Sequence, residues 1–342
     1  MGLLGFKMML GMFPSAKKIE KQYDALSREY QEYMDYSRSD EYTRYEYLSK
    51  YLDSPEFEER ENNPDVPRAE INEIRNEFKR LEKSSKLGAY LKLKDKEAKF
   101  APVKAWNLEF EDHFTGEKLD TDKWLTRYYW GDKLLNNAYS LPGNQHCNTD
   151  GKNVSLSQSK LSIHTRNETT KGLMWDPVFG FAQRDFPYTS GLINTGKSFR
   201  QAYGKVEAKI KVPKGEAYHA FWLAGEQMLP QINIFKYSGK KFHLENFWGD
   251  PANPNGIQKN STAISGDFAD KYCIFSLEWT PKHLEWSING VVFNTVSRGI
   301  PFQPLYIAFS SGVENDIRLS KPVKLEIDWV RFYTRYNDQS AV

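Results

Sequence analysis

The feature of this sequence that most constrains its fold is a regular alternation of charged and apolar residues near the middle of the chain. Residues 205–212 read K-V-E-A-K-I-K-V. Successive side chains of a β-strand point to opposite faces, so this segment predicts a strand with one face in solvent and one in a core. Residues 325–329 alternate in the same way, and Asn289-Gly290 between two apolar runs predicts a tight hairpin. Many short strands separated by turn residues favour a β-sandwich.

The first hundred residues have a different character. Residues 17–52 contain neither Gly nor Pro, and residues 68–99 are interrupted only by Gly88. The sequence N-N-P-D-V-P lies between these stretches and breaks helices strongly. We therefore predict two helices joined by a Pro-containing turn. The expected organisation is a helical arm at 1–103, a β-sandwich at 104–336 and a tail at 337–342.

An internal repeat with an offset of 45 residues relates the two helical stretches. Six residues of the first copy match six of the second, namely Tyr33, Tyr36, Ser39, Tyr42, Tyr45 and Leu48 with Phe78, Leu81, Ser84, Leu87, Tyr90 and Leu93. Such spacing marks one face of a helix. One interpretation is a helical hairpin that buries a shared stripe. The other is a unit of a helical array, which would make residues 1–103 a docking site for a protein partner.

Bulk properties exclude some classes of function and leave others open. The formal net charge of +2 gives no basis for a nucleic-acid partner. The apolar run at the N-terminus is interrupted by Lys7 and lacks a cleavage site, so it is a poor secretory signal, and it is too short to span a membrane. Localisation is not identified, and a cell surface or a virion remains possible. Cys147 and Cys273 permit one disulfide or two thiols.

Five segments in series resemble the glycoside hydrolases of family 16, the laminarinase and agarase group. They are F-E-D-H-F at 110–114, Y-G-K-V-E-A-K-I-K-V-P-K-G at 203–215, A-F-W-L at 220–223, F-S-L-E-W-T-P at 275–281 and I-D-W-V-R-F-Y at 327–333. The resemblance covers about residues 107–334. It implies an all-β jelly roll of the concanavalin A type, with an open cleft on the concave face of two curved sheets.

The resemblance also implies where the chemistry should lie. The family cleaves β-linked glucans or galactans with retention, using two carboxyl groups about 5–5.5 Å apart. Its motif is E-x-D-x-x-E on one strand, with a bulge that turns the last Glu to the same face as the first two acids. The matching segment here is Q-I-N-I-F-K, so Gln231, Asn233 and Lys236 stand at the three acidic positions.

These replacements remove the expected chemistry. The Gln231 amide is not expected to form a glycosyl ester, and the Lys236 ammonium inverts the charge of a general acid. We therefore expect no catalytic residue at these degenerate positions. The sequence offers no obvious acidic partner for Lys236. This lysine could contact an acidic or sulfated sugar, or it could turn to solvent or form a local salt bridge.

The same cleft could still hold a sugar. The resemblance places Trp222 and Trp248 where the family stacks sugars, and Trp130 lies in a loop that often borders the cleft. With Gln231, Asn233, Lys236 and Glu245 they form the predicted carbohydrate-binding set. No metal-ligand cluster and no cofactor are expected; the resemblance permits a structural calcium ion, but no motif identifies its ligands.

Three functions follow, in order of preference. The first is a catalytically inactive family member that binds a β-glucan or galactan. The second is a structural component of a larger assembly, for example a virion or a multiprotein machine, docked by its helical arm. The third is an active endo-glycosidase with a rearranged site, for which Glu245 is the best substitute carboxylate.

Overall fold

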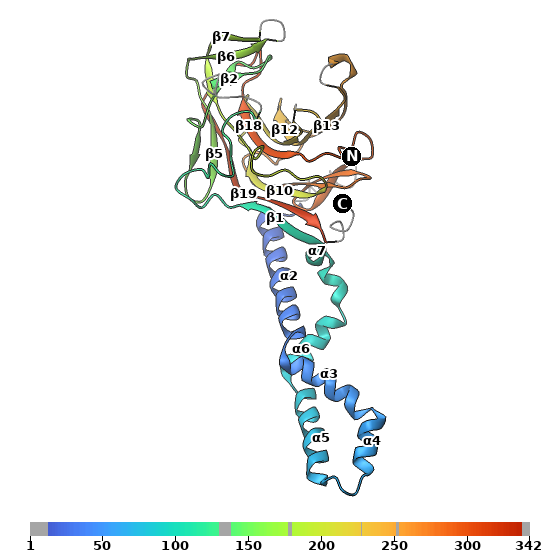
Figure 1. Ribbon diagram of the computed structural model, residues 1–342. Coiled ribbons are helices and arrows are strands. Elements are labelled where there is room, and N and C mark those ends of the chain that lie inside the picture. The colour runs from blue at the N-terminus through green and yellow to red at the C-terminus, as the bar shows by residue number, and fades with distance from the viewer. Residues whose placement is uncertain (1–12, 130–137, 177–179, 227, 251–252, 337–342) are drawn as a thin grey trace. The chain divides into compact units, whose positions relative to one another are not determined.

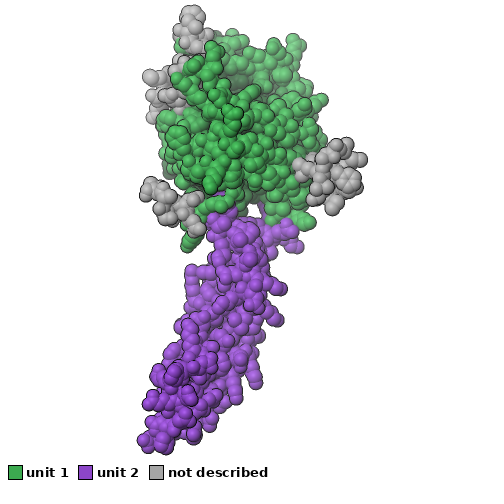
Figure 2. Space-filling view, turned by 90° about the vertical axis from the view of Figure 1, so that its right-hand side faces the viewer, with its two compact units in different colours: residues 1–19, 107–342 green, residues 20–106 purple. Residues whose placement is uncertain are grey.

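The computed structural model describes residues 13–129, 138–176, 180–226, 228–250 and 253–336. These residues form two compact units, one of residues 20–106 and the other containing residues 107–342 together with the chain before residue 20 (Figure 2). The sequence prediction placed residues 13–19 in the helical arm, whereas their contacts belong to the β unit. The predicted tail at 337–342 and Trp130 lie outside the described residues.

The helical unit contains more helices than the two that the sequence predicts. They are α2 (Ala16–Ser37), α3 (Asp40–Leu52), α4 (Pro55–Asn62), α5 (Arg68–Glu82), α6 (Ser85–Lys94) and α7 (Ala101–Lys104), with a 3₁₀ turn at Glu97–Phe100 before α7. The two predicted helices are each interrupted at the serine that the 45-residue repeat makes equivalent. Ser39 is extended, and its side chain accepts the Tyr42 N–H at 3.2 Å, which caps α3. Ser84 is extended at the same place before α6.

The helical unit has its own aromatic core. Tyr33 stacks on Tyr90 with ring centroids 5.0 Å apart, and Tyr42 lies 4.6 Å from the same ring. Leu87 and Phe100 complete the buried cluster. Both copies of the repeat therefore contribute side chains to one core, as the hairpin interpretation expects.

The β unit is a sandwich of two antiparallel sheets, as predicted (Figure 1). The outer sheet has the order β17-β16-β15-β10-β19-β5-β4, with β1 also paired to β19. Its strands are β1 (Trp106–Asp112), β4 (Val154–Leu156), β5 (Leu161–Thr165), β10 (Gly204–Lys211), β15 (Tyr272–Trp279), β16 (Leu284–Ile288), β17 (Val291–Val296) and β19 (Val323–Arg335).

The second sheet has the order β14-β13-β12-β11-β18-β9 and bears the pocket described below. Its strands are β9 (Leu192–Asn194), β11 (Tyr218–Ala224), β12 (Gln231–Ser238), β13 (Lys241–Trp248), β14 (Gln258–Ile264) and β18 (Tyr306–Gly312). A smaller sheet, β7-β6-β2-β3-β8, consists of β2 (Ala138–Ser140), β3 (His146–Thr149), β6 (Thr170–Asp176), β7 (Gly180–Phe186) and β8 (Tyr188–Ser190).

The sequence patterns explain how the two large sheets pack. Buried and partly exposed residues alternate along β10 without exception, which confirms the strand predicted at 205–212. The predicted hairpin is also confirmed, because Asn289 and Gly290 join β16 to β17 with φ values of 47° and 73°. Apolar side chains of both sheets form one core, which includes Ile210, Phe235 and Phe275.

Two further features of the chain bear on its chemistry. Cys147 and Cys273 are both buried free thiols, and burial raises the pKa of Cys147 to about 12 and that of Cys273 to about 11. Among the helices in the described part of the chain, none is long and apolar enough to cross a membrane.

Candidate functional site

A bulge in β12 brings Gln231, Asn233 and Lys236 to one face of the sheet. Asn233 pairs with Glu245 of β13, but the next pair is Lys236 with His243, so β12 contains one extra residue. The pairing of β12 with β11, its other neighbour in the sheet, shows the same shift of register. Ile234 and Phe235 consequently both enter the core, and Lys236 returns to the face of Gln231 and Asn233. The predicted bulge is confirmed.

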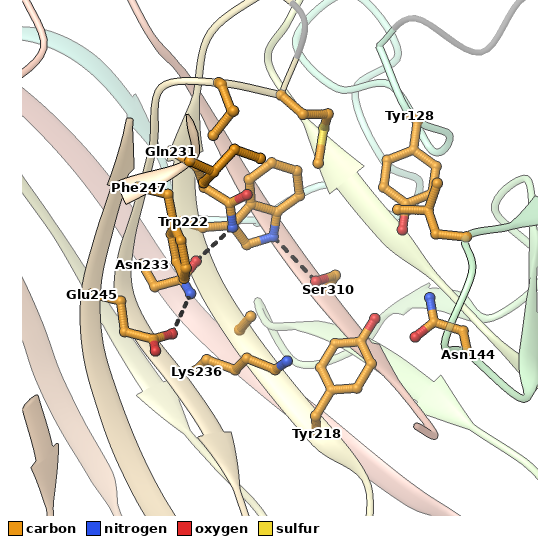
Figure 3. Close-up of a pocket in the computed structure, with 15 residues that line it drawn as sticks. Tyr128, Asn144, Tyr218, Trp222, Gln231, Asn233, Lys236, Glu245, Phe247 and Ser310 are labelled. Atoms are coloured by element: carbon orange, nitrogen blue, oxygen red, sulfur yellow. Dashed lines mark hydrogen bonds between the residues drawn. The ribbon is translucent and has the colours of Figure 1, made fainter. Parts of the chain in front are cut away.

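That face borders a pocket of about 390 Å³ (Figure 3). Amides, hydroxyls and aromatic rings make up much of its lining, which comprises Tyr128, Leu141, Asn144, Tyr218, Ala220, Trp222, Met228, Leu229, Gln231, Asn233, Lys236, Glu245, Phe247, Ile257 and Ser310. Five of the predicted residues, Trp222, Gln231, Asn233, Lys236 and Glu245, therefore lie around one pocket.

Two of the amides and the carboxylate that line the pocket form a continuous chain of hydrogen bonds. The Gln231 Nε2 donates to the Asn233 Oδ1 at 2.8 Å, and the Asn233 Nδ2 donates to the Glu245 Oε2 at 2.9 Å (Figure 3). The Ser261 hydroxyl donates to the other oxygen of Glu245 at 2.8 Å. Both donors to Glu245 are neutral groups, and the chain of hydrogen bonds fixes the positions of the two amides.

Lys236 forms a salt bridge, which is one of the alternatives that the sequence left open, with an acidic partner that the sequence did not identify. Its Nζ lies 2.6 Å from the Oε1 of Glu314, and the side chains are 32% and 39% exposed. Glu314 is 78 residues away in the sequence, in the segment that follows β18. The ammonium also lies 5.2 Å from the centre of the Tyr218 ring. An ion pair at this separation in sequence leaves no local pattern, which explains why this partner was not predicted.

The aromatic residues differ in how they meet the pocket. Trp222 lines it but is only 4% exposed, and its Nε1 donates to the Ser310 hydroxyl at 3.1 Å. Trp248, which the sequence placed in the cleft, is not among the described lining residues, and its ring lies against Gly299. Adjacent residues of a strand face opposite sides, so Phe247 occupies the pocket side instead.

Two tyrosines that line the pocket are almost completely buried. Burial raises the pKa of Tyr128 to about 12 and that of Tyr218 well above its ordinary value. Both phenols therefore remain neutral and can donate or accept a hydrogen bond near neutral pH. Tyr218 could have been found from the sequence, because it precedes Trp222 by four residues on the same strand and thus shares its face.

A buried histidine lies next to these tyrosines. His146 is completely buried, its ring centre is 5.7 Å from that of Tyr218, and its Nδ1 lies 3.0 Å from the Val313 N–H. Burial lowers the pKa of His146 to about 4, so the ring is neutral at pH 7. In the described residues no group of three or more His, Cys, Asp or Glu side chains is arranged to hold a metal ion.

An antiparallel sandwich with a polar, aromatic pocket on one sheet defines the class of this protein as a jelly roll of the concanavalin A type. A family comparison identifies it more closely, because residues 137–331 match the model of glycosyl hydrolases family 16. That match covers more than half of the chain. The chain belongs to glycosyl hydrolase family 16, as its sequence motifs predicted.

Individual relatives agree with this assignment. The chain is 24% identical over 268 residues to the glucan endo-1,3-beta-glucosidase A1 of Niallia circulans, and the match covers 68% of this chain and 38% of that protein. It is 26% identical over 141 residues to the beta-1,3-glucan-binding protein of Penaeus monodon, which covers 34% of this chain and 37% of that protein. The chain thus spans well under half the length of these two relatives.

A solved structure supports the fold. The catalytic domain of an endo-1,3-beta-glucanase (laminarinase) from Thermotoga petrophila superposes with a TM-score of 0.53 at 21% identity. The superposition covers 69% of this chain and 100% of that domain.

Proposed function

We propose that this chain binds a β-glucan, or a galactan, in the pocket of its concave sheet and does not hydrolyse it. The observation that carries this proposal is the face presented by β12. Gln231, Asn233 and Lys236 line the pocket together, and we align them with the three acids of the family motif. Two amides and an ammonium supply neither a nucleophile for a glycosyl ester nor a proton donor of suitable acidity.

The same groups are suited to holding a sugar. A sugar ring offers C–H groups to apolar and aromatic surfaces and hydroxyls to fixed polar groups. Phe247 and Trp222 provide the former, and the chain of amides provides the latter. One relative is named a beta-1,3-glucan-binding protein, a name that refers to binding and not to an enzyme activity.

Calorimetry of the full chain with laminari-oligosaccharides and agaro-oligosaccharides tests the proposal, together with a reducing-end assay on the same mixtures. We expect saturable binding of one class and no release of reducing ends. Gln231→Ala should weaken binding about tenfold through the loss of one or two hydrogen bonds. Gln183→Ala, on the exposed face of β7, is the matched control and should bind as the wild type does. Failure to bind either class would contradict the proposal.

A hydrolase with a rearranged site is the competing function that the pocket allows. Glu245 lines the pocket and is joined to Asn233 by a hydrogen bond, so a carboxylate does lie beside the substituted motif. Sustained release of reducing ends that disappears in Glu245→Gln would replace the binding proposal with this one.

A structural role in a larger assembly, docked by residues 1–103, is the remaining candidate. The helical unit favours it, because residues 20–106 form a separate unit that the family match does not include. Tyr47 of this unit is 53% exposed and stacks on Tyr51. This candidate predicts negligible glycan affinity in the calorimetry and loss of assembly when the helical unit is deleted from the chain.

A further inference from the structure

The charges around the pocket are few and unequal. Among the described lining residues, only Lys236 and Glu245 carry a formal charge at neutral pH. Glu245 is 8% exposed and accepts hydrogen bonds from Asn233 and Ser261, neither of which is cationic. Glu314 lies against Lys236 and adds a second negative charge. Lys236, Glu245 and Glu314 together are therefore negative overall, despite the lysine at the end of the Q-I-N-I-F-K segment.

Glu314 is held in position for this contact by its backbone. Its segment forms a β-bridge with Asn144, which itself lines the pocket. The Gln145 side-chain amide donates to the carbonyl oxygens of Glu314 and Ile317 at 2.8 and 2.9 Å. Because the carboxylate is already placed 2.6 Å from the ammonium, a ligand anion would compete with a preorganised intramolecular partner.

We infer that the pocket selects uncharged glycans, and that Glu314 sets this selectivity by neutralising Lys236. The inference rests on the proposed function, since it concerns which sugars the same pocket accepts. A sulfated or carboxylated sugar must displace Glu314 from Lys236 and also meet the buried charge of Glu245. A neutral sugar meets neither cost, because amides and hydroxyls recognise its hydroxyl groups.

The test measures the affinities of the full chain for laminarihexaose and for the same oligosaccharide sulfated at its primary hydroxyls. We expect the wild type to prefer the neutral ligand by about tenfold or more. Glu314→Gln exposes the Lys236 charge to the ligand. Hydrogen bonds to charged groups are the stronger kind, so the ratio of sulfated to neutral affinity should rise about tenfold to a hundredfold in this variant.

Two further variants isolate the cause. Lys236→Gln in the Glu314→Gln background should abolish the gain, because the ammonium that receives the sulfate is absent. Glu278→Gln removes a carboxylate from the ion pair with Arg335 on the outer sheet and should leave the ratio unchanged. If Glu314→Gln unfolds, Lys236→Gln tests the inference instead. In that variant the Glu314 carboxylate is no longer neutralised, so the ratio of sulfated to neutral affinity should fall below the wild-type value. Thermal unfolding shows which variants are folded.

The outcomes separate this inference from the proposed function. If the wild type binds both ligands equally, or if Glu314→Gln leaves the ratio unchanged, the inference is overturned while glycan binding stands. If the wild type binds neither ligand but Glu314→Gln binds the sulfated one, the neutralising role of Glu314 is supported and the proposed function fails. If no variant binds either ligand, both are overturned.

Discussion

Replacing Asn233 by aspartate should destabilise the protein strongly at neutral pH. Asn233 and Glu245 are 3% and 8% exposed, and the amide nitrogen lies 2.9 Å from the carboxylate oxygen. An aspartate there would place two carboxylate charges about 4 Å apart in a buried site, where they repel by about 4 kcal/mol at an effective dielectric constant of 20. The folded protein can reduce this cost only by binding a proton that the unfolded chain does not hold at pH 7.

The sign of the pH dependence follows from that proton. Between about pH 4 and neutrality the folded variant holds one more proton than its unfolded state, so its stability falls as the pH rises, by about 1.4 kcal/mol per unit. We therefore expect Asn233→Asp to unfold at nearly the wild-type urea concentration at pH 4.5 and to be about 3–4 kcal/mol less stable at pH 7.

Urea unfolding of four proteins at the two pH values measures the effect. They are the wild type, Asn233→Asp, Glu245→Gln and the double variant, in which a glutamine amide can donate to the new aspartate. The double-mutant cycle should give a coupling energy of about 3 kcal/mol at pH 7 and much less at pH 4.5. Equal stability of Asn233→Asp and the wild type at pH 7 would refute the arrangement of this buried pair.

Three other predictions concern stability. Burial lowers the pKa of His146 to about 4, below its unfolded value of about 6.5. The neutral ring should therefore contribute stability that is fully present above pH 6.5 and is lost by about 1.4 kcal/mol per pH unit as the pH falls toward 4. His146→Phe should flatten this part of the dependence of urea stability on pH. Gly299→Ala should cost about 2 kcal/mol or more in thermal unfolding, because Gly299 has a φ of +67° and a Cβ there would lie 2.1 Å from the Trp248 ring. Ser39→Ala should lower the stability of the helical unit by about 1 kcal/mol through loss of its cap, which helix content during thermal unfolding measures.

Much of the sandwich could be predicted because its sequence periods are local. The alternation along 205–212 specifies β10, and the turn residues 289–290 specify a hairpin, since both patterns depend only on backbone geometry. The bulge in β12 was expected from the resemblance to the family, whose motif has one extra residue before its last acid. The interruptions of the two predicted helices were missed because they do not follow from local sequence. Serine is tolerated inside a helix, and Ser39 and Ser84 end one only because of the tertiary packing around them.

The pocket was less accessible to sequence reasoning, because its electrostatics depend on partners distant in the chain. Glu314 reaches Lys236 across 78 residues, and Ser261 reaches Glu245 from the next strand. Either Phe247 or Trp248 had to face the pocket, because adjacent residues of a strand point to opposite sides of the sheet. The pairing of β13 with β12 places Phe247 on the pocket side. Composition and spacing carry no information on the distant partners, whereas alternation from Glu245 would have placed Phe247 on the pocket side.

These long-range partners also determine what an acidic side chain at position 233 or 236 would meet. An aspartate in place of Asn233 would meet Glu245, and a glutamate in place of Lys236 would meet Glu314, whose carboxylate now lies 2.6 Å from the ammonium. Each introduced acid would therefore create a repelling pair unless its neighbour changed as well. The amides, the lysine and their two acidic neighbours form a mutually compatible set of charges. Such compatibility supports the proposed binding function, in which Glu245 and Glu314 stabilise Asn233 and Lys236.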